Sequence, residues 1–411
     1  MRPVFIVLGK ETRENLEDVK NTLKERKVDS FDLEKPDGTV VRINLQAEMS
    51  MVDGKMRAMV TGLMGAYCLL CTVDKKTACG ISEEAQNAVQ LESFFHINRS
   101  PEETKADYDR LVDENGRLKR LRGDYADRKG VTQEPLADEN MNSVSPLHSL
   151  MRSFDFVKSL LYHLRSETFQ WTESTLQLGR SAPFFTKAKD EVRERVLEET
   201  GLPLDAADPT GMGGNSNKGD LCKRLLTDHR EVLVSLVPER FKDDFRELLC
   251  RIWVVVKLYT SNEKINSAQL KEFCVETYSL ILNKFNNTSR WISISPTVHA
   301  LLAHSWEIIE NHDERGMGEF TESGLENNNK FLRFYRRNLA RKTNQESNME
   351  DCLTRLWLRS DPVVRDSGPT AMCSRCSTKG HFTVSCPSKN NLPVQSSLSL
   401  DEFYLTALVC E

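Results

Sequence analysis

Hydrophobic and polar positions follow two different periods along this chain. Near the start, residues 4–8 are a short apolar run typical of a buried strand, and residues 11–27 have apolar positions at helical spacing. Residues 30–45 alternate on either side of Pro36-Asp37-Gly38, which predicts a β-hairpin. The first part of the chain is therefore expected to be a small α/β segment.

Helical spacing dominates the chain beyond residue 60. Apolar residues recur every three or four positions between Gly and Pro breaks. This pattern predicts helices over residues 151–166, 187–200, 219–232, 238–260, 267–285, 296–311, 323–342 and 349–358. Residues 101–143 are highly charged and have helical spacing only in places, which indicates a surface segment.

Charge is unevenly distributed, although the total is close to neutral. The 411 residues are 39% hydrophobic, 28% charged and carry a net charge of -5, an ordinary composition with room for two or three domains. Every charged residue between 330 and 342 is basic. Such a run is often only a solvated face, but a local basic patch also predicts contact with a polyanion such as DNA.

The composition favours an intracellular protein. The chain opens without the pattern of a secretory leader, and its longest uncharged stretch, residues 58–73, is too short to span a membrane. In that compartment the eleven cysteines favour metal ligation or reduced thiols over disulfides.

The tail carries a complete zinc-knuckle spacing. Four ligands lie within fourteen residues in the order Cys373-x2-Cys376-x4-His381-x4-Cys386. The ring of Phe382 is a candidate for stacking on a nucleic-acid base. Ser374 stands where nucleic-acid knuckles usually have an aromatic residue, so protein binding remains an alternative.

A second set of metal-ligand types is spread across the chain. Cys68 and Cys71 are two residues apart, and His299 and His304 are five apart. Spacing alone leaves two interpretations open: one shared zinc site, or a redox-like cysteine pair and an unrelated histidine pair in the core.

Two carboxylates precede or open helical stretches, and one of them is a candidate ligand for a divalent cation. Glu326 opens a predicted helix whose later charged residues are all basic, which favours a metal ligand close to a phosphate backbone. The alternative is a first-turn acid stabilised by the helix dipole. Asp53 precedes Gly54 and a helical stretch, which by itself favours an N-cap that accepts backbone N–H bonds. The candidate nucleic-acid contacts are Lys330, Arg333, Arg336, Arg337, Arg341 and, in the tail, Phe382.

The segment HALLAHSWEIIENHDERGMGEFTESGLENNNKFLRFYRRNLARK, from His299, resembles the end of the catalytic core of the V(D)J recombination-activating (RAG) recombinase and its relatives, the Transib and ProtoRAG transposases. Further stretches resemble the family in the same order. They are SMVDGKMRAMVTGL, SFFHINRS, SPLHSLMRSF and GMGGNSNKGDLCKRLL. The resemblance covers most of residues 1 to about 360, and ProtoRAG-type tails carry a similar Cys/His element.

The resemblance assigns roles to these residues. It implies one structural zinc site formed by Cys68, Cys71, His299 and His304. It also implies that Asp53 and Glu326 are the second and third acids of a DDE active site that uses Mg²⁺ or Mn²⁺. His96, Tyr259 and Phe320 fall near family positions close to DNA, although such aromatic residues are more often part of a core.

The implied fold is a partial RNase H-like core interrupted by a largely helical, zinc-bearing insertion, followed by a linker and a CCHC knuckle. The expected segments are 1–60 (partial core), 61–310 (insertion), 311–360 (catalytic helix region), 361–370 (linker), 371–390 (knuckle) and 391–411 (tail).

The implied activity is DNA nicking followed by transesterification, in the nucleus, by a homodimer with an accessory subunit and no membrane partner. No residue of the chain matches the first catalytic Asp, so we expect the chain to be inactive alone, and whether it is an enzyme stays open. The alternative function is a catalytically inactive, domesticated zinc-knuckle protein that binds nucleic acid or another protein.

Overall fold

The computed structural model describes residues 30–34, 39–44, 54–79, 92–113, 129–136, 144–166, 183–206, 217–286, 294–321 and 323–360, with isolated helical positions at 14, 17, 18 and 21. The chain divides into two compact units. One comprises Glu11–Thr321 with Leu400–Glu411, and the other Glu322–Ser399 with Met1–Lys10. Each is described by itself.

A single hairpin supplies the strands of the described residues. Strands β1 (Ser30–Glu34) and β2 (Val40–Asn44) pair antiparallel, with Ser30 opposite Asn44 and Glu34 opposite Val40. This confirms the predicted hairpin, although its turn and the predicted strand at 4–8 lie outside the described residues. No larger sheet is found in the described part, so the RNase H-like core is not shown there.

The rest of the larger unit is helical, as expected for the region beyond residue 60. The longer helices are α2 (Gly54–Thr61), α5 (Pro101–Leu111), α6 (Pro146–Ser166), α8 (Pro183–Thr200), α9 (Gly219–Leu226), α11 (Lys242–Tyr259), α12 (Ser267–Leu280) and α13 (Pro296–Glu310). The shorter ones are α3 (Lys75–Ala78), α10 (Arg230–Ser235), the 3-10 turns η1 (Glu92–Phe95), η4 (Glu239–Phe241) and η6 (Gly318–Phe320), and the π-helix η5 (Ile281–Asn286). We call residues 54–321 of this unit the helical body.

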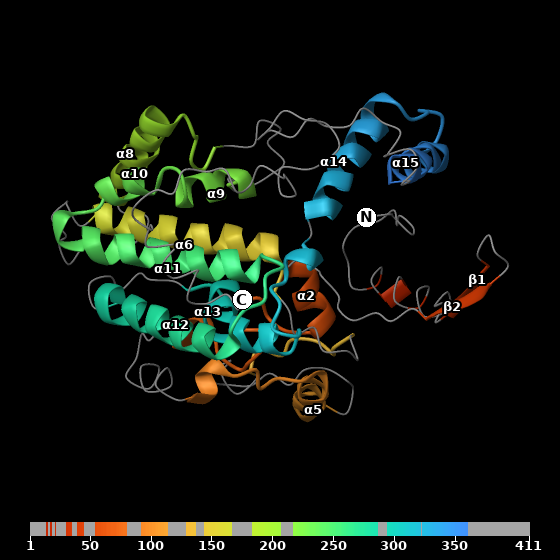
Figure 1. The fold of residues 1–411 in the computed structure, drawn as a ribbon, viewed down its shortest axis with the longest axis horizontal. Helices are drawn as coiled ribbons and strands as arrows, with labels where there is room; N and C mark the ends of the chain where they lie inside the picture. The colour runs from red at the N-terminus through yellow and green to blue at the C-terminus, as the bar shows by residue number, and fades with distance from the viewer. Residues whose placement is uncertain are drawn as a thin grey trace. The chain divides into compact units, whose positions relative to one another are not determined.

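The core of the helical body forms where α6, α11, α12 and α13 lie side by side (Figure 1). Helix α13 is buried on all sides between Val298 and Trp306, and α11 is buried nearly all round between Leu248 and Tyr259. Helices that are apolar around their whole circumference occupy the centre of a fold, whereas α8 and α5 present one buried stripe and a charged outer face. The central position of α13 fixes its histidines inside the protein.

Local hydrogen bonds define the ends of several helices. Ser295 caps α13 by accepting from the backbone N–H of Val298, and Ser100 and Glu103 form a reciprocal capping box at the start of α5. The helix predicted over 219–232 is broken into α9 and α10. The guanidinium of Arg230 donates to the Leu226 carbonyl at 2.8 Å, and this carbonyl would accept the Arg230 N–H in an unbroken helix.

Helices α14 (Ser323–Asn338) and α15 (Gln345–Ser360) form a helical hairpin in the smaller unit. Helix α14 ends four residues before the predicted position 342. The ammonium group of Lys342 turns back to donate to the carbonyls of Arg336 and Arg337, which closes the last turn. The following loop is held by Arg341, whose guanidinium contacts Asp351 at 2.8 Å.

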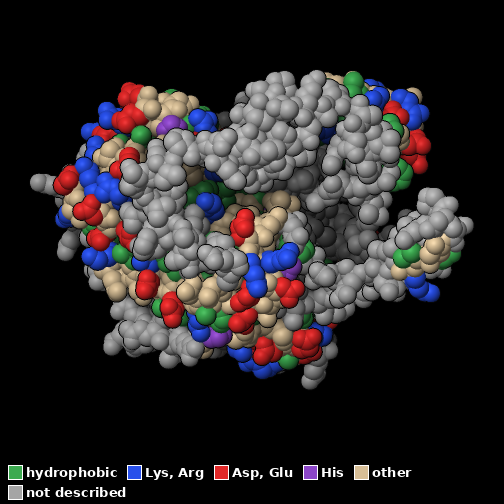
Figure 2. Space-filling view, in the orientation of Figure 1, with side chains coloured by type: hydrophobic (Ala, Val, Ile, Leu, Met, Phe, Trp, Pro, Cys, Tyr) green, Lys and Arg blue, Asp and Glu red, His purple; other side chains and the backbone are tan. Residues whose placement is uncertain are grey.

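Acidic and basic side chains are interspersed on the face of the helical body shown in Figure 2. Many are neighbours on one helix, such as Arg152 with Asp155 and Arg195 with Glu199. Within the described residues, no helix is both long and apolar enough to cross a membrane.

Candidate metal centre and basic helix

Four side chains from distant parts of the chain converge in the helical body. The sulfur atoms of Cys68 and Cys71 and one ring nitrogen each of His299 and His304 all lie within 4.8 Å of one another, and all four residues are buried. Around a tetrahedral zinc ion with Zn–S bonds of about 2.3 Å, two thiolates would be roughly 3.8 Å apart. The arrangement therefore needs only a small contraction to bind a metal ion.

The two cysteines lie in a tight loop between α2 and α3. The Cys68 N–H donates to the Val73 carbonyl at 2.9 Å, and the Leu70 N–H donates to the Cys68 sulfur at 3.4 Å. Backbone donors directed at sulfur stabilise a thiolate and orient it. The loop is anchored to the segment that follows η1, because the backbone N–H of Asn98 donates to the Leu70 carbonyl at 3.1 Å.

The protonation state of His299 follows from its second contact. The Tyr278 hydroxyl donates its single proton to the Ala78 carbonyl at 2.8 Å and lies 3.1 Å from Nδ1 of His299. Burial raises the pKa of Tyr278 well above its usual value, so the hydroxyl keeps its proton. Nδ1 of His299 must therefore donate, which leaves Nε2, 3.4 Å from the Cys71 sulfur, with the lone pair a metal requires.

His304 is the member of the cluster whose polar atoms lack hydrogen-bond partners within the described part of the chain. It is fully buried, and neither of its ring nitrogens has a hydrogen-bond partner among the described residues. Its ring is perpendicular to that of His299 at a centroid distance of 5.1 Å. Burying a polar group without a partner is unfavourable, and coordination of one nitrogen to a cation would satisfy it.

The cysteine thiols influence each other strongly. Burial opposes ionisation of Cys68, but the hydrogen bond from the Cys71 thiol lowers its pKa well below the usual value. The hydrogen bond to Cys68, followed by burial, raises the pKa of Cys71. A bound dication would favour the thiolate form of both cysteines, since metal ligation requires deprotonated sulfur.

Two buried arginines border the cysteines. Arg57 and Arg99 are 7% and 8% exposed, and burial lowers the pKa of both. One terminal nitrogen of Arg99 donates to the Lys129 carbonyl. In both arginines, Nε and one terminal nitrogen have no acceptor among the described residues. The sequence did not indicate Arg57, Arg99 or Tyr278, because a single Arg or Tyr within an apolar pattern carries no spacing signal.

The basic residues of α14 divide into two groups. Arg333, Arg336 and Arg337 are exposed, share one helical face, and have no ion pair among the described residues. Arg341 lies beyond the helix and is paired with Asp351 and Glu350, so its charge is already compensated. Lys330 and Glu326 lie on the α14 backbone, and their side chains are outside the described part.

Several other predicted residues can be placed. Tyr259 is fully buried, and its hydroxyl donates to the Val144 carbonyl at 2.8 Å, so it packs in the core and is not available to stack on a base. His96 lies 3.5 Å from Glu307 and 3.3 Å from Lys271, and Phe320 packs at 4.8 Å against His312. Asp53, Phe382 and the knuckle residues Cys373, Cys376, His381 and Cys386 lie outside the described residues.

Comparison with known proteins adds no identification. No protein-family model matches the chain, and no curated protein sequence matches it. The fold and the geometry of the Cys/His cluster together define a mostly helical protein with a buried site that could hold a metal ion.

Proposed function

We propose that this chain is the C-terminal part of the catalytic core of a DNA recombinase similar to the RAG recombinase and to ProtoRAG and Transib transposases. In this proposal the Cys/His cluster holds zinc and stabilises the helical body. Helix α14 binds the DNA backbone, and Asp53 and Glu326 contribute to a site for Mg²⁺ or Mn²⁺. The protein would act in the nucleus as a homodimer with an accessory subunit.

One observation carries the proposal. Cys71 and His299 are 228 positions apart, yet their side chains lie 3.4 Å from each other in a buried four-ligand group. Spacing alone left two unrelated pairs equally open, whereas the resemblance required one shared site. Four ligands from the protein fill a tetrahedral zinc site, so the chemistry of this ligand set is structural.

The DNA-binding part is supported by the exposed arginines of α14. Three cations on one face, without acidic partners in the described residues, suit the phosphates of a nucleic acid, and Phe334 beside them is 51% exposed. The same arginines also suit the alternative function, a catalytically inactive nucleic-acid-binding protein, because binding DNA through arginines requires no catalytic carboxylates.

DNA affinity as a function of salt concentration tests the binding part. Replacing Arg333, Arg336 and Arg337 together with Ala should weaken binding to all duplex sequences and flatten the salt dependence by about 0.9 units of slope per lost phosphate contact. The control replaces Arg152, Arg193 and Arg195 with Ala, since these arginines already pair with acids on their own helices. Equal slopes for the two triple variants would contradict the proposal.

Mn²⁺ binding in the presence of DNA, followed by electron paramagnetic resonance, tests the catalytic part. If Asp53 and Glu326 ligate one metal ion, Asp53→Asn and Glu326→Gln should each lower the affinity for Mn²⁺. The affinity of the double variant should then be no lower than that of the single variant with the larger loss. Independent, additive effects would favour the non-catalytic alternative.

A further inference from the structure

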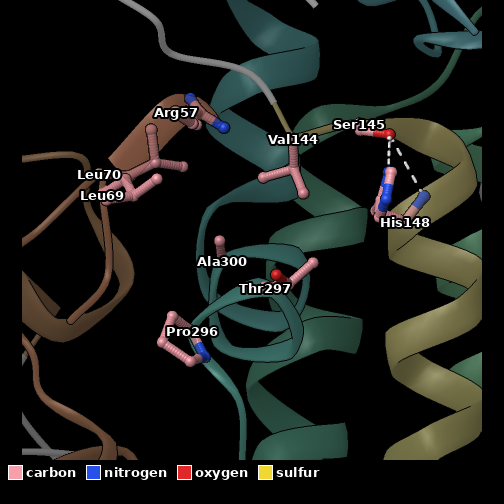
Figure 3. A pocket seen from close by; sticks show the side chains of 9 residues that line it. All are labelled: Arg57, Leu69, Leu70, Val144, Ser145, His148, Pro296, Thr297 and Ala300. Atoms are coloured by element: carbon pink, nitrogen blue, oxygen red, sulfur yellow. Dashed lines mark hydrogen bonds between the residues drawn. The ribbon is translucent and has the colours of Figure 1, made fainter. Parts of the chain in front are cut away.

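A small pocket lies beside the Cys/His cluster of the helical body, and it contains polar groups without hydrogen-bond partners among the described residues. Its volume is about 50 Å³, and nine described residues line it: Arg57, Leu69, Leu70, Val144, Ser145, His148, Pro296, Thr297 and Ala300 (Figure 3). One water molecule needs about 10 to 15 Å³ on this measure, so the pocket has room for a group of a few heavy atoms.

The charge within the pocket comes from Arg57. Its side chain is 7% exposed, and Nε and one terminal nitrogen have no acceptor among the described residues. Burial lowers its pKa to about 10, which still leaves the guanidinium charged at neutral pH. None of the nine lining residues is acidic. A buried cation without a counter-charge is unfavourable, and an anion in the pocket would remove this deficit.

The Cys68 thiolate could supply a negative charge near Arg57, but it is one of the candidate metal ligands. Cys68 contributes to the electrostatic environment of Arg57, but its thiolate belongs to the Cys/His cluster. When two thiolates bind a dication, their charges cancel. Arg57 then faces no net negative charge from that cluster.

Two helix N-termini open onto the same pocket. Ser145 directly precedes the 21-residue α6 and His148 lies in its first turn, and Pro296 and Thr297 begin the 15-residue α13. Figure 3 shows Arg57 on one side, Ser145 and His148 on the opposite side, and the first turn of α13 between them. Helix N-termini present partial positive charge, which adds to the field of the guanidinium.

We propose that this pocket binds a phosphate group, held by the Arg57 guanidinium between the N-termini of α6 and α13. The group could be part of a nucleic-acid backbone or belong to free phosphate or a mononucleotide, since the recognition chemistry is the same. Arg57 offers a planar pair of donors suited to two phosphate oxygens, and the hydroxyl of Thr297 and the imidazole of His148 offer further polar atoms. The proposal does not depend on the catalytic role of Asp53 or Glu326.

Titration of the full chain with inorganic phosphate at constant ionic strength, followed by calorimetry, is the direct test. The wild type should bind one phosphate saturably, and Arg57→Met should raise Kd at least tenfold. The matched control is Arg99→Met, which removes the other buried arginine, one that does not line the pocket, and should keep the wild-type Kd.

Thermal unfolding supplies a second measurement. Phosphate stabilises many proteins non-specifically, so the informative quantity is the difference in Tm shift between wild type and Arg57→Met. Without phosphate Arg57→Met should have the higher Tm, because it removes a buried charge that has no acidic partner among the described residues, and phosphate should narrow this difference in Tm. If Arg57→Met does not fold, Thr297→Val replaces it and should weaken phosphate binding. Absence of saturable binding by the wild type, or equal Kd values for wild type and Arg57→Met, would overturn the proposal.

A competition experiment distinguishes the two sources of phosphate. If the ligand is a backbone phosphate, inorganic phosphate at constant ionic strength should displace labelled duplex DNA, and Arg57→Met should reduce the salt slope of DNA binding by about 0.9. If the ligand is free phosphate or a mononucleotide, phosphate should bind while DNA affinity stays the same in both proteins.

Discussion

The hydroxyl of Tyr278 links a histidine of the metal centre to the backbone of α3. Because it fixes the tautomer of His299, Tyr278→Phe should leave Nδ1 without its acceptor and the Ala78 carbonyl without its donor. Loss of such an outer hydrogen bond typically weakens metal binding by about 10- to 100-fold. Competition with a chromophoric chelator measures the change.

The control at the residue scale is Tyr259→Phe. Tyr259 is equally buried and also bonds to a backbone carbonyl, but that carbonyl belongs to Val144 and not to the metal centre. This variant should lose stability with little change in metal affinity. If both variants bind metal as tightly as the wild type, Tyr278 does not position His299.

At the scale of elements, the charge available on the α14–α15 hairpin depends on the ion pairs of Arg341 with Asp351 and Glu350. Asp351 accepts from both the backbone N–H and the guanidinium of Arg341, which also lowers the pKa of Asp351. Asp351→Asn together with Glu350→Gln should release Arg341, increase DNA affinity at low salt and steepen the salt dependence. By the same reasoning Arg341→Ala should cost less affinity than Arg336→Ala. Fluorescence anisotropy with one duplex compares the variants, and a larger loss in Arg341→Ala would contradict this division of roles.

The helices illustrate what periodicity can and cannot predict. Apolar spacing located α6, α8, α11, α13, α14 and α15, because their apolar residues repeat at the helical period. It missed the break after Leu226 and the early end of α14, since each depends on one long side chain returning to a carbonyl. The π-helix Ile281–Asn286 at the end of α12 likewise left no mark on the pattern.

The metal centre marks a similar limit for the site. The spacing of the two cysteines predicted one ligand pair, and the two histidines were a second. That the two pairs form a single site was predicted only by the resemblance, because spacing carries no information across 228 residues. The sequence did not predict a role for Arg57, for a different reason. Arg57 is of interest because two of its nitrogens have no acceptor among the described residues. That property depends on how the chain packs and not on the neighbouring residues in the sequence.

At the scale of the whole molecule, the Cys/His cluster joins the two ends of the helical body. The intact chain should contain two zinc ions. The double variant His299→Ala/His304→Ala should lose one together with most of the cooperative unfolding transition, because the free energy of binding in a closed site contributes to folding. Deleting residues 368–411 should remove the other, that of the proposed knuckle, and leave the transition intact.

Metal analysis by mass spectrometry, together with thermal unfolding, measures both effects. His229→Ala is the control, since this histidine lies in the turn between α9 and α10, away from the cluster. Less than one zinc per intact chain would contradict the assignment of both sites.

The long separation between the metal ligands also has a consequence for biosynthesis. Cys68 and Cys71 leave the ribosome early, but their partner His299 is made 228 residues after Cys71. At about 5 to 20 residues per second, the thiols wait roughly 10 to 45 s before the site can close. During that interval they are reactive towards oxidants and competing metals, so the yield of correctly assembled protein should depend on the redox state and zinc supply of the cell while the chain is being translated.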